Sequence, residues 1–290
     1  AYELVIRDWS SDVGSSDLST PTWHQGALYR LTPNGRIASF DSRTGKERWA
    51  ADLTERFGSG FGIWGLAENL IVDGDRVFCM PGGARGRVVA LHKDTGATLW
   101  TNTEIDHPAA YCSPTIVDHR GQRQLLTMTQ KSVVALSPDD GRLIWSTPFV
   151  PTSPQNALTP VYHQGRFFVA CGHHTGGTVF EIEDDARAAK PLWHRVDLDN
   201  CHGGALLIDG RLYGSACRQG GKQFYCVDFA SGETIKLDDT LGKVGITLAD
   251  GMLYCLNHQG TMSLLAITPD GFDIASQFLI EKRPANYFLA

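Results

Sequence analysis

The residues best suited to chemistry in this 290-residue sequence are seven cysteines, ten histidines and scattered carboxylates. The cysteines stand at positions 79, 112, 171, 201, 217, 226 and 255, and no two are adjacent. Neither C-x-x-C, C-x-x-C-H nor H-E-x-x-H occurs, so the usual spacings of a zinc site and of a covalent haem are missing. His173 and His174 would need two further ligands, which the sequence does not nominate. We therefore expect no metal site.

Nucleophilic and phosphate chemistry have no better candidates. Ser113 precedes Pro114 and lacks the G-x-S-x-G turn that exposes a nucleophile. The GGARGR stretch, residues 82–87, lacks the Lys and Ser/Thr of a phosphate loop, so a hairpin loop is the better interpretation. Asp73 and Asp75 are not followed by the alternating acidic residues and closing Glu of a calcium loop. We expect no catalytic residues in this chain.

The composition of the sequence limits the classes of partner that the protein can bind. The formal net charge of −6 gives no basic field for nucleic acid or an anionic membrane. No stretch approaches the roughly 20 consecutive apolar residues that a membrane helix needs. A protein or a small polar ligand is the expected partner, with no nucleic acid and no transmembrane segment.

The elements that would position a site come from a repeat. Three segments share a β-rich run, an acidic turn, a Gly and a Trp four residues after that Gly, ending at Trp49, Trp100 and Trp145. Spacings near 45–51 residues suit one four-stranded propeller blade each. Weaker copies place Trp193, Lys236 and Ala275 at the Trp position. We predict an all-β propeller with about six recognisable four-stranded blades, whose Trp residues pack between neighbouring sheets.

A second marker predicts the inner hairpin of each blade. Gln-Gly or Asp-Gly pairs stand between β-rich runs, as two-residue turns with positive φ require. The stretches are HQGALY, DGDRVF, HQGRFF, DGRLY and DGMLY, which begin at residues 24, 73, 163, 209 and 250.

These hairpins define one candidate site. Residues just upstream of each inner strand should converge at one mouth of the central channel. His202 and Lys243 lie at equal distances from successive Asp-Gly turns. The predicted ligand-binding set at that mouth is Trp64, Glu68, Tyr111, Asn156, His202 and Lys243. The alternative, that these side chains merely fill or solvate the channel mouth, stays open.

The cysteines favour a structural role. Cys79, Cys171, Cys226 and Cys255 lie in apolar runs, where a free thiol behaves as a small buried hydrophobe. An odd number of cysteines fits no complete disulfide framework, which argues against an oxidising compartment.

A family resemblance covers residues 19–290. The stretches WGLAENLIVDGDRVFCMPGG, AAYCSPTIV, NCHGGALLIDGRLYG and LLAITPDGF resemble bacterial PQQ-like β-propeller repeat proteins. The resemblance implies a periplasmic or cell-envelope location. It also implies either a non-enzymatic propeller or a PQQ-dependent alcohol dehydrogenase. Dehydrogenases of this kind carry a vicinal Cys pair and a calcium ion beside the quinone. Because this chain has no adjacent cysteines, no cofactor is evident, although the resemblance keeps PQQ with calcium open.

The two ends of the sequence call for separate interpretations. Residues 1–18, AYELVIRDWSSDVGSSDL, resemble translated adapter DNA from short-read sequencing, which predicts a non-native tail and a metagenomic fragment. Residues 283–290, RPANYFLA, resemble the opening of a further blade. We therefore expect residues 19–290 to be an incomplete propeller domain, truncated at both ends, with its signal peptide unobservable. Open sheet edges on such a fragment would favour association with other chains.

Two functions follow as hypotheses. The first is a non-enzymatic propeller of the cell envelope that acts as a scaffold for a protein or small ligand. The alternative is a PQQ-dependent alcohol dehydrogenase-like oxidoreductase.

Overall fold

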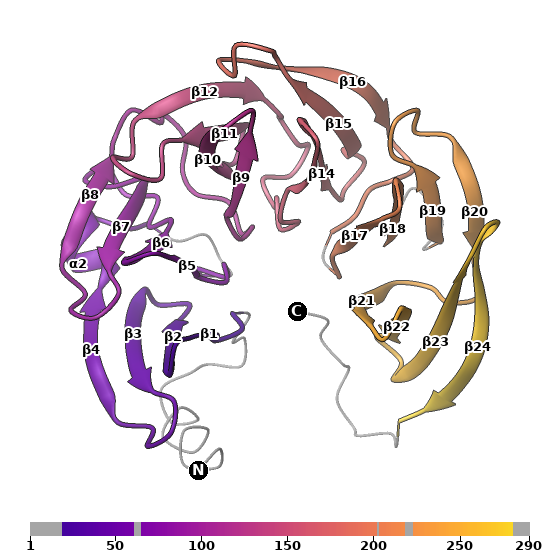
Figure 1. Ribbon diagram of the computed structural model, residues 1–290, viewed down its shortest axis with the longest axis horizontal. Helices are drawn as coiled ribbons and strands as arrows, with labels where there is room; N and C mark the ends of the chain where they lie inside the picture. Colours follow the sequence, from indigo (N-terminus) through magenta and orange to yellow (C-terminus); the bar gives the residue numbers. More distant parts are fainter. Residues whose placement is uncertain (1–18, 61–64, 202, 218–222, 281–290) are drawn as a thin grey trace. The chain divides into compact units, whose positions relative to one another are not determined.

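The computed structural model describes residues 19–60, 65–201, 203–217 and 223–280. The chain divides into two compact units, residues 1–149 and 150–290. Each unit contains three four-stranded antiparallel sheets, and each sheet is a meander in which consecutive strands pair. Figure 1 shows this succession of strands within each sheet. One short helix is present among the described residues, so the predicted all-β class is confirmed.

The three sheets of unit 1 have the following strands. Sheet 1 contains β1 (Thr22–His24), β2 (Ala27–Leu31), β3 (Arg36–Asp41) and β4 (Glu47–Asp52). Sheet 2 contains β5 (Ile71–Asp73), β6 (Arg76–Cys79), β7 (Val88–His92) and β8 (Thr98–Asn102). Sheet 3 contains β9 (Thr115–His119), β10 (Gln122–Met128), β11 (Ser132–Leu136) and β12 (Leu143–Pro148). Helix α2 (Leu53–Phe57) follows β4.

Unit 2 repeats this plan. Sheet 4 contains β13 (Val161–His163), β14 (Arg166–Cys171), β15 (Gly176–Ile182) and β16 (Ala189–Arg195). Sheet 5 contains β17 (Ala205–Ile208), β18 (Arg211–Ser215), β19 (Phe224–Asp228) and β20 (Thr234–Asp238). Sheet 6 contains β21 (Val244–Ala249), β22 (Met252–Asn257), β23 (Thr261–Thr268) and β24 (Gly271–Leu279).

The predicted inner hairpins are present. In Gln25-Gly26, Gln164-Gly165, Asp209-Gly210 and Asp250-Gly251 both residues have positive φ, as a type I′ turn requires. Residues 73–76 differ, because Asp73 still pairs with Arg76 and the two turn residues are Gly74 and Asp75. A further hairpin joins β9 to β10 through Arg120 and Gly121, both with positive φ, at a place where we predicted none.

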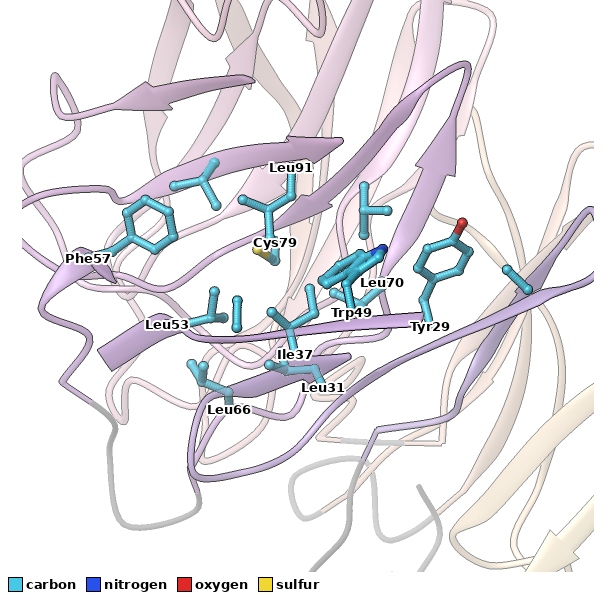
Figure 2. Packing of buried hydrophobic residues seen from close by; sticks show 14 residues of the cluster. Tyr29, Leu31, Ile37, Trp49, Leu53, Phe57, Leu66, Leu70, Cys79 and Leu91 are labelled. Atoms are coloured by element: carbon cyan, nitrogen blue, oxygen red, sulfur yellow. The ribbon is translucent and has the colours of Figure 1, made fainter. Parts of the chain in front are cut away.

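Two of the three recurring Trp residues, Trp49 and Trp100, bond to the neighbouring sheet, as predicted. Trp49 Nε1 donates to the carbonyl of Lys93 at 2.7 Å, and Trp100 Nε1 donates to that of Pro138 at 3.1 Å. Figure 2 shows Trp49 within the apolar cluster that sheets 1 and 2 bury, beside Tyr29 and Leu70. Trp145 differs, since its Nε1 donates to Gln124 of its own sheet at 3.0 Å.

The recurring Gly has a steric cause. A β-carbon on Gly96 would lie 2.5 Å from the ring of Trp49, and one on Gly141 would lie 2.3 Å from the ring of Trp100. Gly96 and Gly141 therefore each give the Trp of the preceding sheet its packing surface, and Gly232 does the same for Trp193. Lys236 occupies the Trp position in sheet 5, and its ammonium donates to Asp273 at 2.9 Å and lies 5.0 Å from the centre of the Phe272 ring.

Sheet register corrects one assignment. The Trp of sheet 1 pairs with Ser39 directly beyond a β-bulge, and the corresponding residue of sheet 6 is Ser276, which pairs with Leu264. Ala275, the residue that we placed at the Trp position, is the extra residue of that bulge. The difference arises because the turn before β24 is shorter than the turn before β4.

Candidate functional site

The four predicted site residues that the structure describes lie on the connectors that lead into the first strand of a sheet. Because every sheet is a four-stranded meander, these connectors share one end of each unit with the loops between second and third strands. Glu68 and Tyr111 precede β5 and β9 in unit 1, and Asn156 and Lys243 precede β13 and β21 in unit 2. Trp64 and His202 lie outside the described residues. Convergence of the whole set into one funnel spans both units and remains a prediction.

The burial of the four described residues differs. Glu68 is 2% exposed and Asn156 is fully buried, whereas Tyr111 and Lys243 are half-buried. Glu68 stands six residues before its turn residue Gly74, but Lys243 stands seven before Asp250. A shift of one residue along an extended segment turns a side chain to the opposite side. The sequence spacing alone therefore did not reveal that Glu68 points into protein.

Glu68 holds its connector to the end of β6. Its Oε1 accepts a hydrogen bond from the backbone N–H of Met80 at 2.7 Å. Its Oε2 is buried and has no hydrogen-bond partner in the part of the chain that the structure describes. Burial raises the pKa of Glu68 to about 8, against the smaller opposing effect of the Met80 bond. The side chain is consequently mostly protonated and neutral at pH 7.

Several sulfur-containing side chains lie near Glu68, and their thiols are neutral. Thr127 Oγ1 donates to the thioether of Met80 at 2.6 Å and lies 3.7 Å from Cys112 Sγ. Burial raises the pKa of Cys112 to about 12 and that of Cys79 well above its usual value. Neutral thiols are poor nucleophiles and poor metal ligands. The prediction that Cys79 is a buried hydrophobe is confirmed, and the same holds for Cys171, Cys226 and Cys255.

In unit 2 a disulfide joins Cys201 to Cys217, and we predicted no such bond. It ties the connector before β17 to the loop after β18, where Cys217 N–H also donates to Asp199 Oδ1 at 3.0 Å. Our argument from the odd number of cysteines against an oxidising compartment was therefore wrong. Cysteine counting failed because one pair forms while the other five cysteines remain free and buried.

Next to this disulfide lies the turn between β14 and β15. A β-carbon on Gly172 would lie 2.1 Å from Cys201 Sγ. The disulfide therefore packs directly against the backbone of Gly172, where a larger residue would not fit. His173 and His174 follow with φ of 55° and 69°, and Thr175 N–H closes the turn on Gly172 O at 3.2 Å. Two consecutive residues other than Gly in the left-handed region store some strain. His173 Nε2 lies 3.0 Å from Gln155 Oε1, one residue before Asn156.

The other sequence motifs have structural roles. Residues 82–87 form the predicted loop between β6 and β7, closed by pairing of Gly83 with Gly86. Asp73 forms an ion pair with Arg123 at 2.8 Å, and Asp75 forms one with Arg76 at 3.2 Å. Among the described residues, no three His, Cys, Asp or Glu side chains form a group that could hold a metal ion. In the same part of the chain, no helix is long and apolar enough to cross a membrane.

A calcium–quinone group of the dehydrogenase type does not fit the described residues. A calcium ion needs several oxygen ligands, but Glu68 Oε1 accepts from Met80 N–H, and Glu68 belongs to no group of three His, Cys, Asp or Glu side chains among the described residues. The disulfide joins residues sixteen apart rather than adjacent cysteines.

Known sequences similar to this chain include outer membrane protein assembly factors and quinoprotein dehydrogenases. The outer membrane protein assembly factor BamB of Salmonella typhimurium is 34% identical over 89 residues, which are 31% of this chain and 19% of that protein. Quinoprotein ethanol dehydrogenase of Pseudomonas aeruginosa is 30% identical over 139 residues, 43% of this chain and 22% of the enzyme. The matched segments thus span about a fifth of each relative's length.

Solved structures share the fold. BamB from Moraxella catarrhalis superposes with a TM-score of 0.67 at 15% identity, covering 91% of this chain and 76% of that chain. Quinohemoprotein alcohol dehydrogenase from Comamonas testosteroni gives a TM-score of 0.56 at 14% identity, covering 86% and 52%. These likenesses confirm the β-propeller fold and leave function undecided.

One family model decides the family. It is described as outer membrane protein assembly factor BamB, and it matches residues 7–237. That range covers most of the chain and includes five of the six sheets. The resemblance to PQQ-like repeat proteins is therefore confirmed, and the chain belongs to the family of the outer membrane protein assembly factor BamB.

Proposed function

We propose that this protein is a non-enzymatic β-propeller scaffold of the cell envelope that binds a protein partner in outer membrane protein assembly. The observation that carries the proposal is the family match over residues 7–237. The connectors support it, because their buried polar groups mainly hold backbone: Glu68 binds Met80 N–H, and Asn200 Nδ2 donates to Gly204 O at 2.7 Å. Connectors that are held to backbone in this way suit a scaffold.

The periplasm is the proposed location. The Cys201–Cys217 disulfide supports it, since structural disulfides persist in oxidising compartments. Export of the protein to the periplasm should oxidise this pair, and cytosolic production should leave it reduced. Thiol alkylation followed by mass spectrometry distinguishes the two states. A pair that stays reduced after export would contradict this location.

The direct test of the scaffold is complementation. A Salmonella typhimurium strain that lacks its own BamB would receive this chain, exported to the periplasm. We expect the abundance of outer membrane proteins to rise toward that of the parent strain. No rise, despite folded and oxidised protein in the periplasm, would contradict the proposal.

A quinone-dependent dehydrogenase is the second candidate, favoured by the matches to quinoprotein alcohol and ethanol dehydrogenases. In that case the predicted channel-mouth residues would bind an anionic or polyhydroxylated ligand such as the quinone. Calorimetric titration with pyrroloquinoline quinone and calcium tests this candidate. The scaffold proposal predicts no saturable binding. Saturable binding that weakens when His202 and Lys243 are both replaced by Ala would favour the dehydrogenase instead.

A further inference from the structure

The connector of residues 65–70, which leads into β5, is bonded to segments of unit 1 on both sides of sheet 2. Leu66 N–H donates to Pro33 O, in the turn after β2, at 3.0 Å. Asn69 N–H donates to Ser113 Oγ, on the connector before β9, at 2.8 Å. Movement of this connector would therefore break bonds to sheet 1 and to the connector that leads into sheet 3.

Connector 65–70 also contributes to the apolar core between sheets 1 and 2. Leu66 and Leu70 are buried in the same cluster as Cys79, the last residue of β6, and Figure 2 shows all three. The thiol of Cys79 is free and its side chain is fully buried. Release of the connector would remove Leu66 and Leu70 from this cluster and leave Cys79 less protected from solvent.

Glu68 is the one titratable residue of connector 65–70. Of its two carboxyl oxygens, only the one bonded to Met80 N–H has a partner in the described part of the chain. Its titratable neighbours are the thiols of Cys79 and Cys112, and burial together with the proximity of Glu68 raises the pKa of both. Among the described residues no charged side chain contributes to the pKa of Glu68. An ionised carboxylate would thus be buried with one hydrogen bond and no cation, which is costly.

We propose that Glu68 is a proton-dependent latch, which holds connector 65–70 at the end of β6 while its carboxyl is protonated and releases the connector when the proton passes to solvent. An ionised carboxylate gains hydration by moving outward, so the closed state binds a proton that the open state loses. Opening should therefore become easier as pH rises from 4.5, the ordinary pKa of an exposed Glu, to the raised pKa of Glu68, about 8, and should change no further above it. This inference concerns unit 1 alone and does not depend on the proposed scaffold function.

Labelling of native protein with iodoacetamide tests the latch through Cys79. Cys255, a fully buried free thiol of sheet 6, is the control within the same chain, and the ratio of the two labelling rates cancels the ionisation of the thiols themselves. We expect the ratio of Cys79 to Cys255 to rise about tenfold from pH 6 to pH 7 in the parent and in the exposed control variant Glu233→Gln. It should stay constant in Glu68→Gln, whose amide does not ionise. A constant ratio in the parent, or a rise that Glu68→Gln retains, would overturn the proposal.

Hydrogen exchange of the parent gives a second measurement if Glu68→Gln folds poorly. The Met80 amide, which donates to Glu68, should exchange about a hundredfold faster at pH 7 than at pH 6, about tenfold from hydroxide catalysis and about tenfold from opening. The Lys93 amide donates to Asp75 O at the opposite end of sheet 2 and should gain only the factor of about ten from hydroxide. Equal pH dependence at Met80 and Lys93 would mean that no local release occurs, and it would overturn the latch.

Discussion

Replacement of Glu68 by Gln should make stability less dependent on pH. The carboxyl is buried, and its pKa rises from 4.5 to about 8 on folding because burial disfavours the charged form. The folded state therefore holds a proton that the unfolded state loses between these two values. The stability contributed by the neutral carboxyl is complete below about pH 4.5, falls as pH rises, and is lost above about pH 8.

The magnitude follows from the size of the shift. Each pH unit within the window costs about 1.4 kcal/mol, so the loss at pH 7 is of the order of 3 kcal/mol. The amide of Gln keeps an acceptor for Met80 N–H and places a donor where the protonated carboxyl has one. The two proteins should thus have similar stability near pH 4.5, and Glu68→Gln should become increasingly more stable than the parent up to about pH 8.

Denaturant unfolding followed by tryptophan fluorescence at pH 5, 6, 7 and 8 measures this difference. The control is Glu233→Gln, which removes an exposed carboxyl, and its difference from the parent should change little with pH. A stability difference between Glu68→Gln and the parent that stays constant from pH 5 to 8 would refute the buried neutral carboxyl.

Three further changes test the architecture. Serine at both Cys201 and Cys217 should lower the free energy of unfolding by about 3 kcal/mol, as expected for a bridge spanning sixteen residues, and equal stability with and without reductant would contradict this. Gly141→Ala should cost at least about 2 kcal/mol, because φ is +74° and the new carbon would lie 2.3 Å from the Trp100 ring. Its control, Gly121→Ala, has φ of +82° but no atom within 4 Å, so a cost equal to that of Gly141→Ala would show that the Trp contact is unimportant. Deletion of residues 1–18 should leave the melting temperature unchanged if they are foreign to the fold, and a loss of several degrees, about 1 kcal/mol or more, would show that they belong to it.

The fold was predictable because repetition and turn chemistry are local signals. Gly-Trp spacing located the outer strands, and Gln-Gly and Asp-Gly pairs located four inner hairpins of type I′. The hairpin at Arg120 and Gly121 was missed because Arg gives no turn signal, although it adopts φ of 53° there.

The site was less predictable because its features depend on contacts distant in sequence. Cys201 and Cys217 come within bonding distance only when the loop after β18 packs on the connector before β17. The buried state of Glu68 depends on a bond to Met80, twelve residues away, and on a one-residue offset that counting from the turns does not resolve. The joint role of Glu68, Tyr111, Asn156 and Lys243 remains a prediction.

The most direct test of the central claim is the abundance of outer membrane proteins in a Salmonella typhimurium strain that lacks BamB and exports this chain to its periplasm. Quantitative mass spectrometry of isolated outer membranes measures it, and oxidation of Cys201 and Cys217 confirms that the chain has folded there. We predict that the abundance recovers toward that of the parent strain. Folded, oxidised protein with no recovery would contradict a scaffold role in outer membrane protein assembly.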